Sequence, residues 1–439
     1  MFQVNIGMIG GGTVGSGVFH HWQNNRSLLE SRLGMKIDLA RVAVKAVDEP
    51  RPYPIPHSVL STDWAALIND PQIQVVIELV GGTNIAKTMI LAALKLGKPV
   101  ITANKALLSA HGEELFSAAR HYGTNLYYEA SVAGGIPIIK ALREGFVGNR
   151  ISHLYGIVNG TCNYILTRMK REGLEFAPTL QEAQRLGYAE ADPSLDIDGF
   201  DSEHKIGILA SLAHGFWVQP KDIHVEGIRS IGRADIEFAG KLGFTIKLLG
   251  VVKVIPGHKS EKRQSVQVSV YPALIPNNHV LASVDHVFNA IFVRGDVVGD
   301  TLFYGRGAGQ DATASAVLSD IADAALDLKH ATRDRIPPFV PYGPGGMVLP
   351  MREVISRYYL RLDVIDKPGT LAKITSILAS LRIGISSVIQ PEGHEGHSVP
   401  LILMCHDAPN SAMSKALAKI AHLAVVKSPP VMLRVEDFA

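Results

Sequence analysis

Short apolar runs alternate with longer amphipathic stretches along the first 135 residues of the chain. Apolar residues suited to buried strands occupy residues 4–9, 37–47, 75–79, 100–103 and 125–128. Residues 85–96 repeat their apolar positions at the helical period and predict a helix between two of these strands. Strands that alternate with helices are typical of βα units and of a parallel sheet. The pattern therefore predicts an α/β domain over residues 1–135.

A glycine-rich segment at the end of the first strand indicates what this domain binds. GGGTVG at residues 10–15 places G-x-G-x-x-G between a strand and a helix, which is the context that the motif requires. Gly10 permits the tight turn, Gly12 allows close approach of a pyrophosphate, and Gly15 allows close packing of helix on strand. Thr13 and Val14 open the helix and offer backbone N–H groups to the phosphates. We expect a Rossmann-type dinucleotide-binding domain.

Polar residues at the ends of the later strands are candidates for cofactor contacts, because open parallel sheets bind ligands at the carboxyl ends of their strands. Asp48 could hold a ribose 2′-hydroxyl and favour NAD, whereas Lys45 and Arg51 could hold the 2′-phosphate of NADP. The basic pair favours NADP, with NAD still possible and solvated loop charges as the alternative. Thr83 and Lys105 follow later strands and are expected at the same crevice, and the alternative for Lys105 is a surface lysine that caps a strand end.

Residues 136–304 are predicted to form a second domain for substrate binding and oligomerisation. Apolar or alternating stretches predict strands over residues 151–158, 248–254 and 264–271. The first of these strands leads into a helix that begins near Gly160 and Thr161. Asn159 and Thr161 are natural helix caps. Alternatively, their amide and hydroxyl groups and the free N–H groups of the helix could bind a small carboxylate.

Two further segments could return to the cofactor or bind a cation. An amphipathic helix over residues 313–328 follows a glycine loop around Gly307, and residues 305–330 are expected to complete the dinucleotide-binding domain. Gly307 either contacts the cofactor or is only a turn residue. Residues 129–137 combine Glu129 with small residues and Pro137, so exposed carbonyls beside a carboxylate could hold a monovalent cation. Composition alone favours a simpler interpretation, the start of a helix.

The segment 183–205 carries most of the candidate chemistry. Its acidic residues precede one cation, Lys205, and an apolar run over residues 206–213 that predicts a buried helix. Asp201 and Lys205 are spaced i, i+4, so they share one face at the start of that helix. A lysine held beside a carboxylate could be a positioned proton donor. The alternative is a solvated acidic loop with a surface ion pair.

The last third of the chain has its own pattern. Proline and glycine are frequent over residues 331–352, which predicts a linker. Strands and helices then follow in the order βαββαβ over residues 353–439, the ferredoxin-like split βαβ arrangement. We expect a small separate domain there.

Composition describes an ordinary globular protein. The 439 residues are 47% hydrophobic and 19% charged, with 43 basic and 41 acidic residues interspersed for a net charge of +2. This balance gives no reason to expect nucleic acid as a partner. No apolar run reaches the length of about 20 residues that a membrane span needs. Only two cysteines are present, which fits a reducing compartment, and we expect a cytoplasmic protein.

The acidic segment resembles the signature of the homoserine dehydrogenase family. The matching positions are Ala183, Gly187, Tyr188, Ala189, Asp192, Pro193, Asp196, Ile197, Gly199, Asp201 and Lys205. The resemblance extends over the whole chain, through ELVGG at 78–82, ITANKALL at 101–108, NGTCNYIL at 159–166 and GAGQDATASAV at 307–317. DKPGTLAKI at 366–374 is similar to an ACT domain. No aspartate-kinase domain precedes residue 1, so the chain resembles the monofunctional type with an ACT tail.

The resemblance implies reversible reduction of L-aspartate 4-semialdehyde to L-homoserine with NAD(P)H, in the biosynthesis of threonine, methionine and isoleucine. It implies that Lys205 is the acid/base lysine, with Asp201 as its partner and Lys105 as a second lysine at the site. In the family, the substrate would be bound by Glu190, Tyr188, Asp196, Thr161 and Gly160. A sodium ion would be held at Glu129, Val132, Gly134 and Ile136, in place of the simple helix start favoured above.

The remaining implications concern regulation and assembly. The ACT tail implies feedback inhibition by an amino acid such as threonine, and the family implies a homodimer or homotetramer. Asp192, Asp198 and Glu203 are expected to be caps or solvated charges. Two alternatives stay open: a dehydrogenase for another amino acid or semialdehyde, and a non-enzymatic sensor of cofactor and amino acid. A sensor would not need Lys105, Asp201 and Lys205 together.

Overall fold

The computed structural model describes residues 2–256, 264–332, 335, 337–343, 345–391 and 396–438. The chain divides into two compact units, each assembled from three segments. Unit 1 comprises Met1–His153, His204–Pro220 and Asn289–Gly346. Unit 2 comprises Leu154–Glu203, Lys221–Phe288 and Met347–Ala439.

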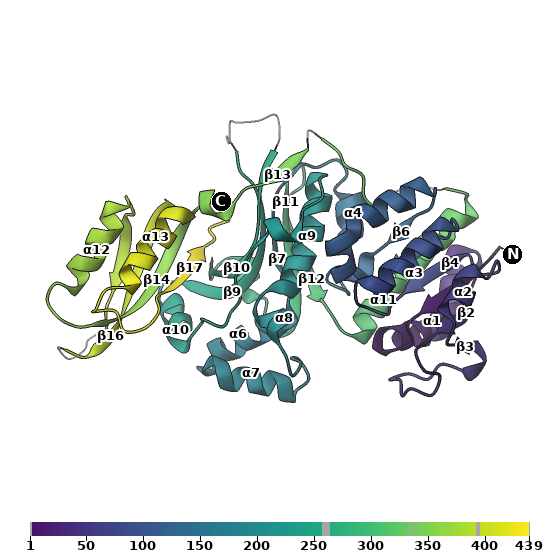
Figure 1. The fold of residues 1–439 in the computed structure, drawn as a ribbon, viewed down its shortest axis with the longest axis horizontal. Coiled ribbons are helices and arrows are strands. Elements are labelled where there is room, and N and C mark those ends of the chain that lie inside the picture. Colours follow the sequence, from purple (N-terminus) through teal and green to yellow (C-terminus); the bar gives the residue numbers. More distant parts are fainter. Residues whose placement is uncertain are drawn as a thin grey trace. The chain divides into compact units, whose positions relative to one another are not determined.

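Unit 1 contains a parallel sheet of six strands (Figure 1), as the alternating pattern predicts. Its strands are β1 (Gln3–Ile9), β2 (Lys36–Ala43), β3 (Leu60–Ser61), β4 (Val75–Glu78), β5 (Val100–Thr102) and β6 (Leu126–Tyr127). The order is β3-β2-β1-β4-β5-β6, so the chain reverses its direction of travel across the sheet between β1 and β4. Ligands of open α/β sheets bind at the carboxyl ends of the strands beside such a reversal.

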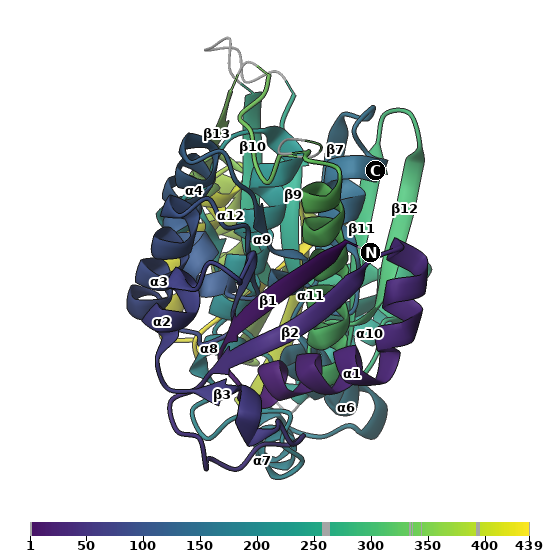
Figure 2. The same cartoon turned by 90° about the vertical axis from the view of Figure 1, so that its right-hand side faces the viewer.

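Helices connect these strands and supply the core of unit 1. They are α1 (Thr13–Leu33), α2 (Trp64–Asn69), α3 (Asn84–Lys95), α4 (Lys105–His121), α5 (Ile138–Lys140) and α11 (Gln310–Lys329). Figure 2 shows α1 and α11 side by side. Val18 and Phe19 of α1 share one buried cluster with Ala314 and Val317 of α11 and with residues of β1 and β2. The late segment of the sequence therefore packs on the first strands. β11 (Phe288–Gly295) and β12 (Gly299–Arg306) pair with each other just before α11.

The second strand is shorter than the prediction over residues 37–47, because β2 ends at Ala43. The guanidinium of Arg51 donates hydrogen bonds to the carbonyls of Ala46, Val47 and Glu49, at 2.7–2.8 Å. These bonds fold the following residues into a loop instead of extending the strand.

Unit 2 is built on a mixed sheet whose order is β7-β9-β10-β17-β14-β16-β15. The strands are β7 (Ile151–Ile157), β8 (His224–Val225), β9 (Phe244–Val254), β10 (Gln264–Pro276), β13 (Gly346–Val348), β14 (Ile355–Ile365), β15 (Ile385–Ile389), β16 (Ser398–Pro409) and β17 (Val431–Val435). The helices are α6 (Gly160–Glu172), α7 (Phe176–Arg185), α8 (Ser194–Ile197), α9 (Phe200–His214), α10 (Arg233–Lys241), α12 (Thr370–Ser380) and α13 (Asn410–Ala421). Of these helices, α9 is shared: it begins at Phe200 in unit 2, and its residues from His204 onward belong to unit 1.

The last part of unit 2 has the predicted order of strand, helix, strand, strand, helix, strand. Residues from α12 and α13, such as Ile374, Leu378 and Met413, share a buried cluster with β14 and β16. The helices therefore cover one face of these strands (Figure 1). The strands also continue the sheet, since β17 pairs in parallel with β10 through Ala273 opposite Arg434.

Candidate active site

The glycine loop after β1 is shaped by positions that allow no side chain. Gly10 has a φ of +106°, and a Cβ there would lie 2.5 Å from the carbonyl oxygen of Leu79. A Cβ on Gly15 would lie 2.0 Å from the carbonyl oxygen of Gly10. The space at Gly12 is open, and α1 begins directly after it without a side-chain cap. The first N–H groups of a helix lack intrahelical partners, so this loop can receive a phosphate.

A cavity of about 640 Å³ adjoins this loop at the carboxyl ends of β1, β2 and β4. Apolar side chains on one side include Val80, Ile85 and Met89, while Lys45, Glu49 and Arg51 contribute the charged part of the lining. The cavity has the mixed lining that suits the adenosine part of a dinucleotide. Four of the predicted cofactor residues therefore line one cavity, namely Gly10, Gly12 and the two cations Lys45 and Arg51.

Those two cations have different surroundings. Lys45 is exposed at the cavity, whereas the Arg51 guanidinium is engaged by the loop carbonyls described above. Arg51 therefore shapes the loop that presents Lys45. Glu49, which the sequence did not single out, supplies a carboxylate to the same lining.

Glu78, at the end of β4, is a buried carboxylate that organises the next loop. Its Oε1 accepts hydrogen bonds from the N–H groups of Val80 (2.8 Å) and Gly81 (3.3 Å), and its Oε2 accepts one from the Thr102 hydroxyl (2.7 Å). Burial raises the pKa of Glu78, and these hydrogen bonds oppose the rise. The signal in the sequence was a single carboxylate closing an otherwise apolar strand.

Lys105 and Thr83 occupy helix starts at the same edge of the sheet. Lys105 is the first residue of α4, and the preceding Asn104 caps that helix by accepting a hydrogen bond from the Leu107 N–H. The Asn104 amide also donates to the carbonyl of Gly82 at 2.7 Å. Thr83 is the N-cap residue of α3 and makes no side-chain cap bond. The Asn104 bridge thus joins the loops that carry the two predicted residues.

The segment around Glu129 forms both a helix start and a buried carboxylate site. The Glu129 carboxylate is 2% exposed and accepts hydrogen bonds from the N–H groups of Ile139 (3.0 Å) and Lys140 (2.8 Å), which open α5. Burial raises the pKa of Glu129 to about 7, although these bonds and the charges of Lys140 and Arg143 oppose the rise. The turn between them holds Ala133 at a φ of +52°.

The other predicted residues of this segment lie close by. Val132 and Ile136 are buried in the turn, and a Cβ at Gly134 would lie 3.3 Å from the carbonyl oxygen of Gly307. A Cβ on Gly307 would lie 1.8 Å from the side-chain nitrogen of Asn289, so this position requires glycine for packing alone. Among the described residues, no group of three or more His, Cys, Asp and Glu side chains could hold a metal ion.

In unit 2, Asn159 joins two of the predicted carboxylates. It is the N-cap of α6, where its Oδ1 accepts a hydrogen bond from the Cys162 N–H at 2.8 Å. Its Nδ2 donates to Asp196 Oδ1 (2.7 Å) and to Asp201 Oδ2 (2.9 Å). The sequence indicated Asn159 only as a cap. Its role as a bridge depends on the approach of α8 and α9, which no local pattern reveals.

Thr161 completes this cluster from the first turn of α6. Its hydroxyl lies 2.7 Å from the carbonyl oxygen of Tyr188 and 3.1 Å from Asp196 Oδ2, and can donate its hydrogen to either. The preceding Gly160 approaches the carbonyl of Val287, which a Cβ would meet at 2.9 Å. The structure thus brings Thr161, Asp196 and Asp201 together.

Tyr188 and Glu190 are exposed on the segment before α8. The ring of Tyr188 packs at a centroid distance of 4.8 Å on that of Tyr164. The side chain of Gln184 donates to the carbonyl of Glu190 at 3.0 Å and holds this segment. Both predicted side chains therefore face solvent beside the carboxylate cluster.

α9 carries the predicted acid/base pair. It begins at Phe200, after Gly199 at a φ of +93°, and places Asp201 and Lys205 one turn apart, as predicted. Asp201 and Lys205 are 5% and 6% exposed, so the alternative of a solvated surface pair does not describe them.

The three acids without a predicted role divide into two kinds. The exposed Asp192 accepts a hydrogen bond from the Ser194 N–H, and Asp198 pairs with Arg229, so these two are charges outside the core. Glu203 differs from the expectation, because it is buried and burial raises its pKa to about 6. The helix turns its side chain away from solvent, which the acidic composition of the segment does not reveal.

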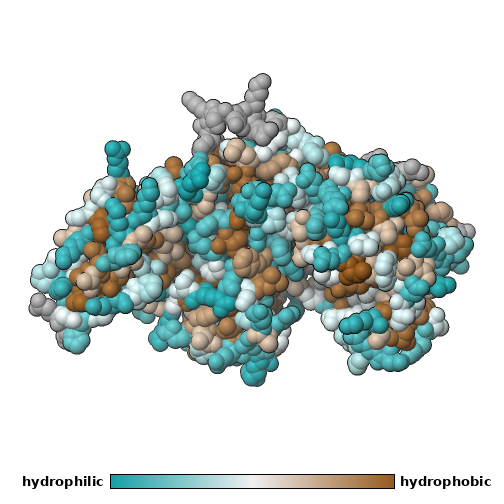
Figure 3. Space-filling model, in the orientation of Figure 1, coloured by the Kyte–Doolittle hydropathy of each residue, from teal (hydrophilic) through white to brown (hydrophobic). Residues whose placement is uncertain are grey.

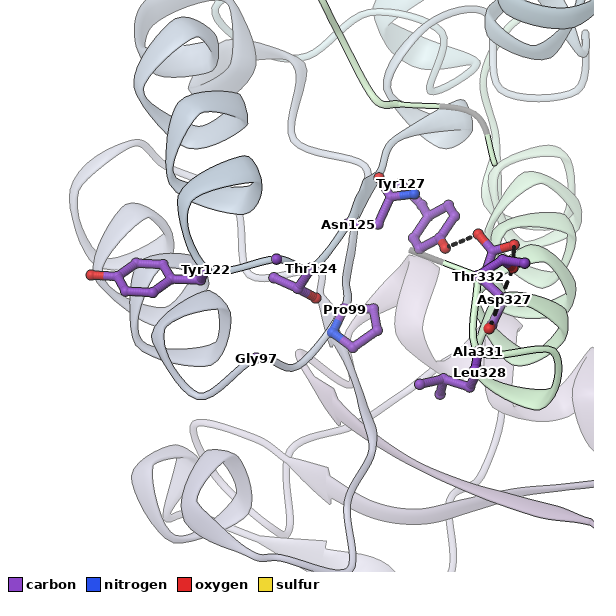
Figure 4. A pocket seen from close by; sticks show the side chains of 11 residues that line it. Gly97, Pro99, Tyr122, Thr124, Asn125, Tyr127, Asp327, Leu328, Ala331 and Thr332 are labelled. Carbon is purple, nitrogen blue, oxygen red and sulfur yellow. Dashed lines mark hydrogen bonds between the residues drawn. The ribbon is translucent and has the colours of Figure 1, made fainter. Parts of the chain in front are cut away.

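A second cavity of unit 1 lies at the amino ends of β5 and β6, away from the glycine loop (Figure 4). It has a volume of about 310 Å³ and adjoins Pro99 and Asn125, which precede β5 and β6. In its wall Tyr127 donates a hydrogen bond to Asp327 at 2.6 Å. Open parallel sheets bind their ligands at the carboxyl ends of the strands, so this cavity is not the cofactor site.

On the face shown in Figure 3, hydrophilic and apolar residues are interspersed. No helix within the described residues is both long and apolar enough to cross a membrane.

The chain is similar to known proteins over its whole length. Residues 10–129 match the family model "Homoserine dehydrogenase, NAD binding domain", and residues 137–322 match "Homoserine dehydrogenase". The chain is 40% identical over 445 aligned residues to homoserine dehydrogenase of Pseudomonas aeruginosa, with 100% of both chains covered. It is 37% identical over 439 residues to that of Bacillus subtilis, with 99% of both covered.

Two solved structures extend the comparison. A homoserine dehydrogenase from Thiobacillus denitrificans has a TM-score of 0.90 and 40% identity, covering 100% of this chain and 99% of its own. A hyperthermophilic archaeal homoserine dehydrogenase in complex with NADPH has a TM-score of 0.61 and 25% identity, covering 74% of this chain and 98% of its own.

Proposed function

Because the chain belongs to the homoserine dehydrogenase family, we propose that it reversibly reduces L-aspartate 4-semialdehyde to L-homoserine with NAD(P)H. It is an oxidoreductase that acts on a CH–OH group, and its product would serve threonine, methionine and isoleucine biosynthesis. The observation that carries the substrate assignment is the cluster of Asp196, Asn159 and Asp201. Two ordered carboxylates provide the counter-charge for an amino-acid ammonium group and for a catalytic lysine.

The environments of the site residues support the roles proposed for them. Asp196 is fixed by Asn159 and Thr161, and with Glu190 and Tyr188 it binds the ammonium end of the substrate. The backbone at Gly160 and the hydroxyl of Thr161 complete the substrate contacts. A fixed carboxylate loses little conformational entropy when it meets its ligand.

Proton transfer is assigned to α9. The bound nicotinamide cofactor supplies the hydride. Lys205 donates a proton to the alkoxide oxygen that forms at the former aldehyde carbon and accepts it in the reverse direction. Asp201, held by Asn159, orients Lys205 and compensates its charge, and Lys105 is the second lysine of the site.

The test is a spectrophotometric assay of NADPH formation from L-homoserine. Wild type should turn over, and Lys205→Ala should lower kcat by at least about 100-fold, the scale of general acid–base catalysis. The exposed Lys221→Ala is the matched control and should retain wild-type kcat. Absence of turnover by wild type would refute the function, and full turnover by Lys205→Ala would refute the lysine assignment.

The cofactor is proposed to be NADP. Lys45 lines the cavity of unit 1 and is placed to meet a 2′-phosphate, with Arg51 supporting its loop, and the archaeal relative binds NADPH. Thr83, Lys105 and Gly307 are proposed as further cofactor contacts. Lys45→Ala should raise KM for NADP at least about tenfold more than KM for NAD, because only NADP has the phosphate. Exposed Lys95→Ala is the control. Equal effects on both cofactors would remove the argument that Lys45 meets the 2′-phosphate.

A monovalent cation, proposed to be sodium, is assigned to Glu129, Val132, Gly134 and Ile136. The buried Glu129 carboxylate supports this assignment, because its pKa of about 7 leaves an unfavourable charge for a cation to compensate. Each oxygen accepts one N–H and retains capacity for another partner. This carboxylate therefore has the oxygen ligands that a hard cation would use.

The strands and helices over residues 353–439 are proposed to be an ACT domain, joined by a linker at 331–352. A cavity of about 470 Å³ lies where β14 passes into α12, lined by Asp366, Lys367 and Thr370 among others. Gln390 donates to Asp366 at 2.9 Å across it. Threonine is the proposed effector. Asp366→Ala should weaken inhibition by threonine, while exposed Asp407→Ala should not, and equal inhibition of all three proteins would dismiss this cavity.

The proposed domains and assembly complete the assignment. We propose a Rossmann domain over residues 1–135 completed by 305–330, a substrate-binding domain over 136–304, and a cytoplasmic homodimer or homotetramer. Light scattering coupled to gel filtration should give a mass of two or four times 47.3 kDa. A monomer would refute the assembly.

A further inference from the structure

One buried arginine joins three elements of unit 2. Arg434 on β17 is 0% exposed, and its Nη1 and Nη2 donate to Glu226 Oε2 (2.8 Å) and Oε1 (2.9 Å). Nη2 also donates to Asn410 at the start of α13, at 2.8 Å. Its guanidinium lies 4.6 Å from the centroid of the Tyr271 ring on β10. Such a planar bidentate pair fixes both position and orientation.

Glu226 is held firmly as the partner. It directly follows β8, and its N–H donates to the carbonyl of Val270 at 2.7 Å. Its Oε1 also lies 2.6 Å from His224 Nε2. Burial would raise the pKa of Glu226, but the hydrogen bonds from His224 and Arg434 outweigh burial and hold that pKa at about 2. The carboxylate is therefore a charged, fixed anchor at neutral pH.

The residues after Glu226 pack backbone against backbone on the turn that leads into α9. A Cβ on Gly227 would lie 2.1 Å from the carbonyl oxygen of Ile197 and 2.5 Å from Cα of Asp198. The N–H of Ile228 donates to that same carbonyl of Ile197 at 2.8 Å. This contact leaves no flexible side chain to absorb a shift of either segment.

That turn lies between the two carboxylates of the proposed substrate site. Asp196 immediately precedes Ile197, and Asp201 lies in the first turn of α9, with Asn159 bonded to both. A displacement of about 1 Å at a site residue can cost on the order of 100-fold in rate. The anchor at Glu226 is therefore coupled to the geometry of both carboxylates.

We propose that Arg434 and Glu226 are positioning residues for the substrate site, through which the C-terminal strands set the placement of Asp196 and Asp201. The proposal rests on the proposed function for its kinetic readout. The contiguous contacts run from β17 through Glu226 and Gly227 to Ile197. Any ligand that shifts β17 would act on substrate binding along this route.

Three variants test the route. Arg434→Lys keeps the charge and loses the bidentate geometry, and Gly227→Ala pushes directly on Ile197 without touching the ion pair. Arg361→Lys is the matched control, because Arg361 on β14 makes a bidentate pair with buried Asp235 at the start of α10 instead of beside Ile197. All three should fold, as judged by circular dichroism.

The expected result is a selective effect on the amino-acid substrate. Arg434→Lys and Gly227→Ala should each lower kcat/KM for L-homoserine at least tenfold, with KM for the nicotinamide cofactor within twofold of wild type. Arg361→Lys should leave kcat/KM for L-homoserine and KM for the cofactor within twofold of wild type. A general loss of stability would instead lower the amount of active enzyme and leave KM for L-homoserine unchanged, which would overturn the proposal.

Hydrogen–deuterium exchange supplies a readout that is independent of activity. Amide exchange over residues 196–203 should be at least tenfold faster in Arg434→Lys and Gly227→Ala than in wild type, and unchanged in Arg361→Lys. This measurement stands even if wild type does not turn over L-homoserine, so failure of the function and failure of this inference are distinguishable. Exchange unchanged in both test variants, or equally raised in the control, would overturn the proposal.

Discussion

Removing the charge of Glu129 is expected to stabilise the protein at alkaline pH in the absence of sodium. The carboxylate is 2% exposed, and burial raises its pKa to about 7 from 4.5. Ionisation of Glu129 is therefore less favourable in the native state than in the unfolded chain. As pH rises from about 4.5 through 7, the unfolded state releases its proton first, and the free energy of unfolding falls.

The magnitude follows from the shift of the pKa of Glu129. A difference of roughly 2.5 units at about 1.4 kcal/mol per unit gives a cost of about 3 kcal/mol above pH 7. Glu129→Gln removes this cost but leaves only one amide oxygen for the N–H groups of Ile139 and Lys140. Loss of one such bond costs about 1 kcal/mol. The variant should therefore be about 2 kcal/mol more stable than wild type at pH 8.5.

The assay is urea unfolding of wild type and Glu129→Gln at pH 5.5 and 8.5, in sodium chloride and in choline chloride at equal ionic strength. In choline, the advantage of the variant should appear at pH 8.5 and shrink at pH 5.5. Sodium should stabilise wild type at pH 8.5 by about 3 kcal/mol when its concentration is 100 times the dissociation constant. The variant should show no sodium effect.

Two results would refute this reasoning. If wild type were the more stable protein in choline at pH 8.5, Glu129 would not carry an uncompensated buried charge. If sodium stabilised Glu129→Gln as much as wild type, the cation would not be bound by this carboxylate. Differences between the two proteins cancel the titration of groups that do not interact with Glu129. Asp320 does interact, since its carboxylate accepts a hydrogen bond from the Glu129 N–H and the Glu129 charge helps to raise its pKa, so its response is part of the measured difference.

Three further predictions concern other positions. Asn159→Ala should lower kcat/KM for L-homoserine about 10- to 100-fold in steady-state kinetics, because Asp196 and Asp201 lose the side chain that joins them. An unchanged value would count against a role for this cluster. Gly15→Ala should abolish cofactor binding in a fluorescence titration, because its Cβ would lie 2.0 Å from the carbonyl of Gly10; binding at wild-type affinity would contradict the loop geometry. Because burial raises the pKa of Glu203 to about 6, its charge destabilises the native state increasingly from pH 4.5 to above 6. The melting temperature of wild type should therefore fall below that of Glu203→Gln on going from pH 5 to pH 7, and parallel melting curves would exclude this effect.

The local features of this protein were readable from its sequence. The glycine spacing at residues 10–15 predicted the turn, the helix start and the missing side chains, because these depend on the backbone of adjacent residues. The i, i+4 spacing of Asp201 and Lys205 likewise predicted their place on one helix. The end of the second strand was predicted too late. The strand β2 stops at Ala43, and the Arg51 guanidinium bonds three carbonyls of the loop that follows.

What the sequence could not reveal were contacts between distant segments. Asn159 was recognisable as a cap, but its bonds to Asp196 and Asp201 span 37 and 42 residues. The burial of Glu203 depends on which face of α9 packs on the core. The acidic residues of this segment do not indicate that face. The pairing of Arg434 with Glu226 spans 208 residues and leaves no local pattern.

The pairing of β17 with β10 also has a consequence for biosynthesis of the protein. Ala273 on β10 pairs with Arg434 on β17. The ribosome must therefore synthesise all residues between these two strands before β17 can pair with β10. Until then, part of the β10 edge presents unpaired backbone groups, which favour association with other chains. The ion pair between Glu226 and Arg434 must likewise wait for β17. Translation that halts before residue 431 should therefore yield aggregation-prone chains, and chaperones that shield strand edges should matter most during synthesis of this final stretch.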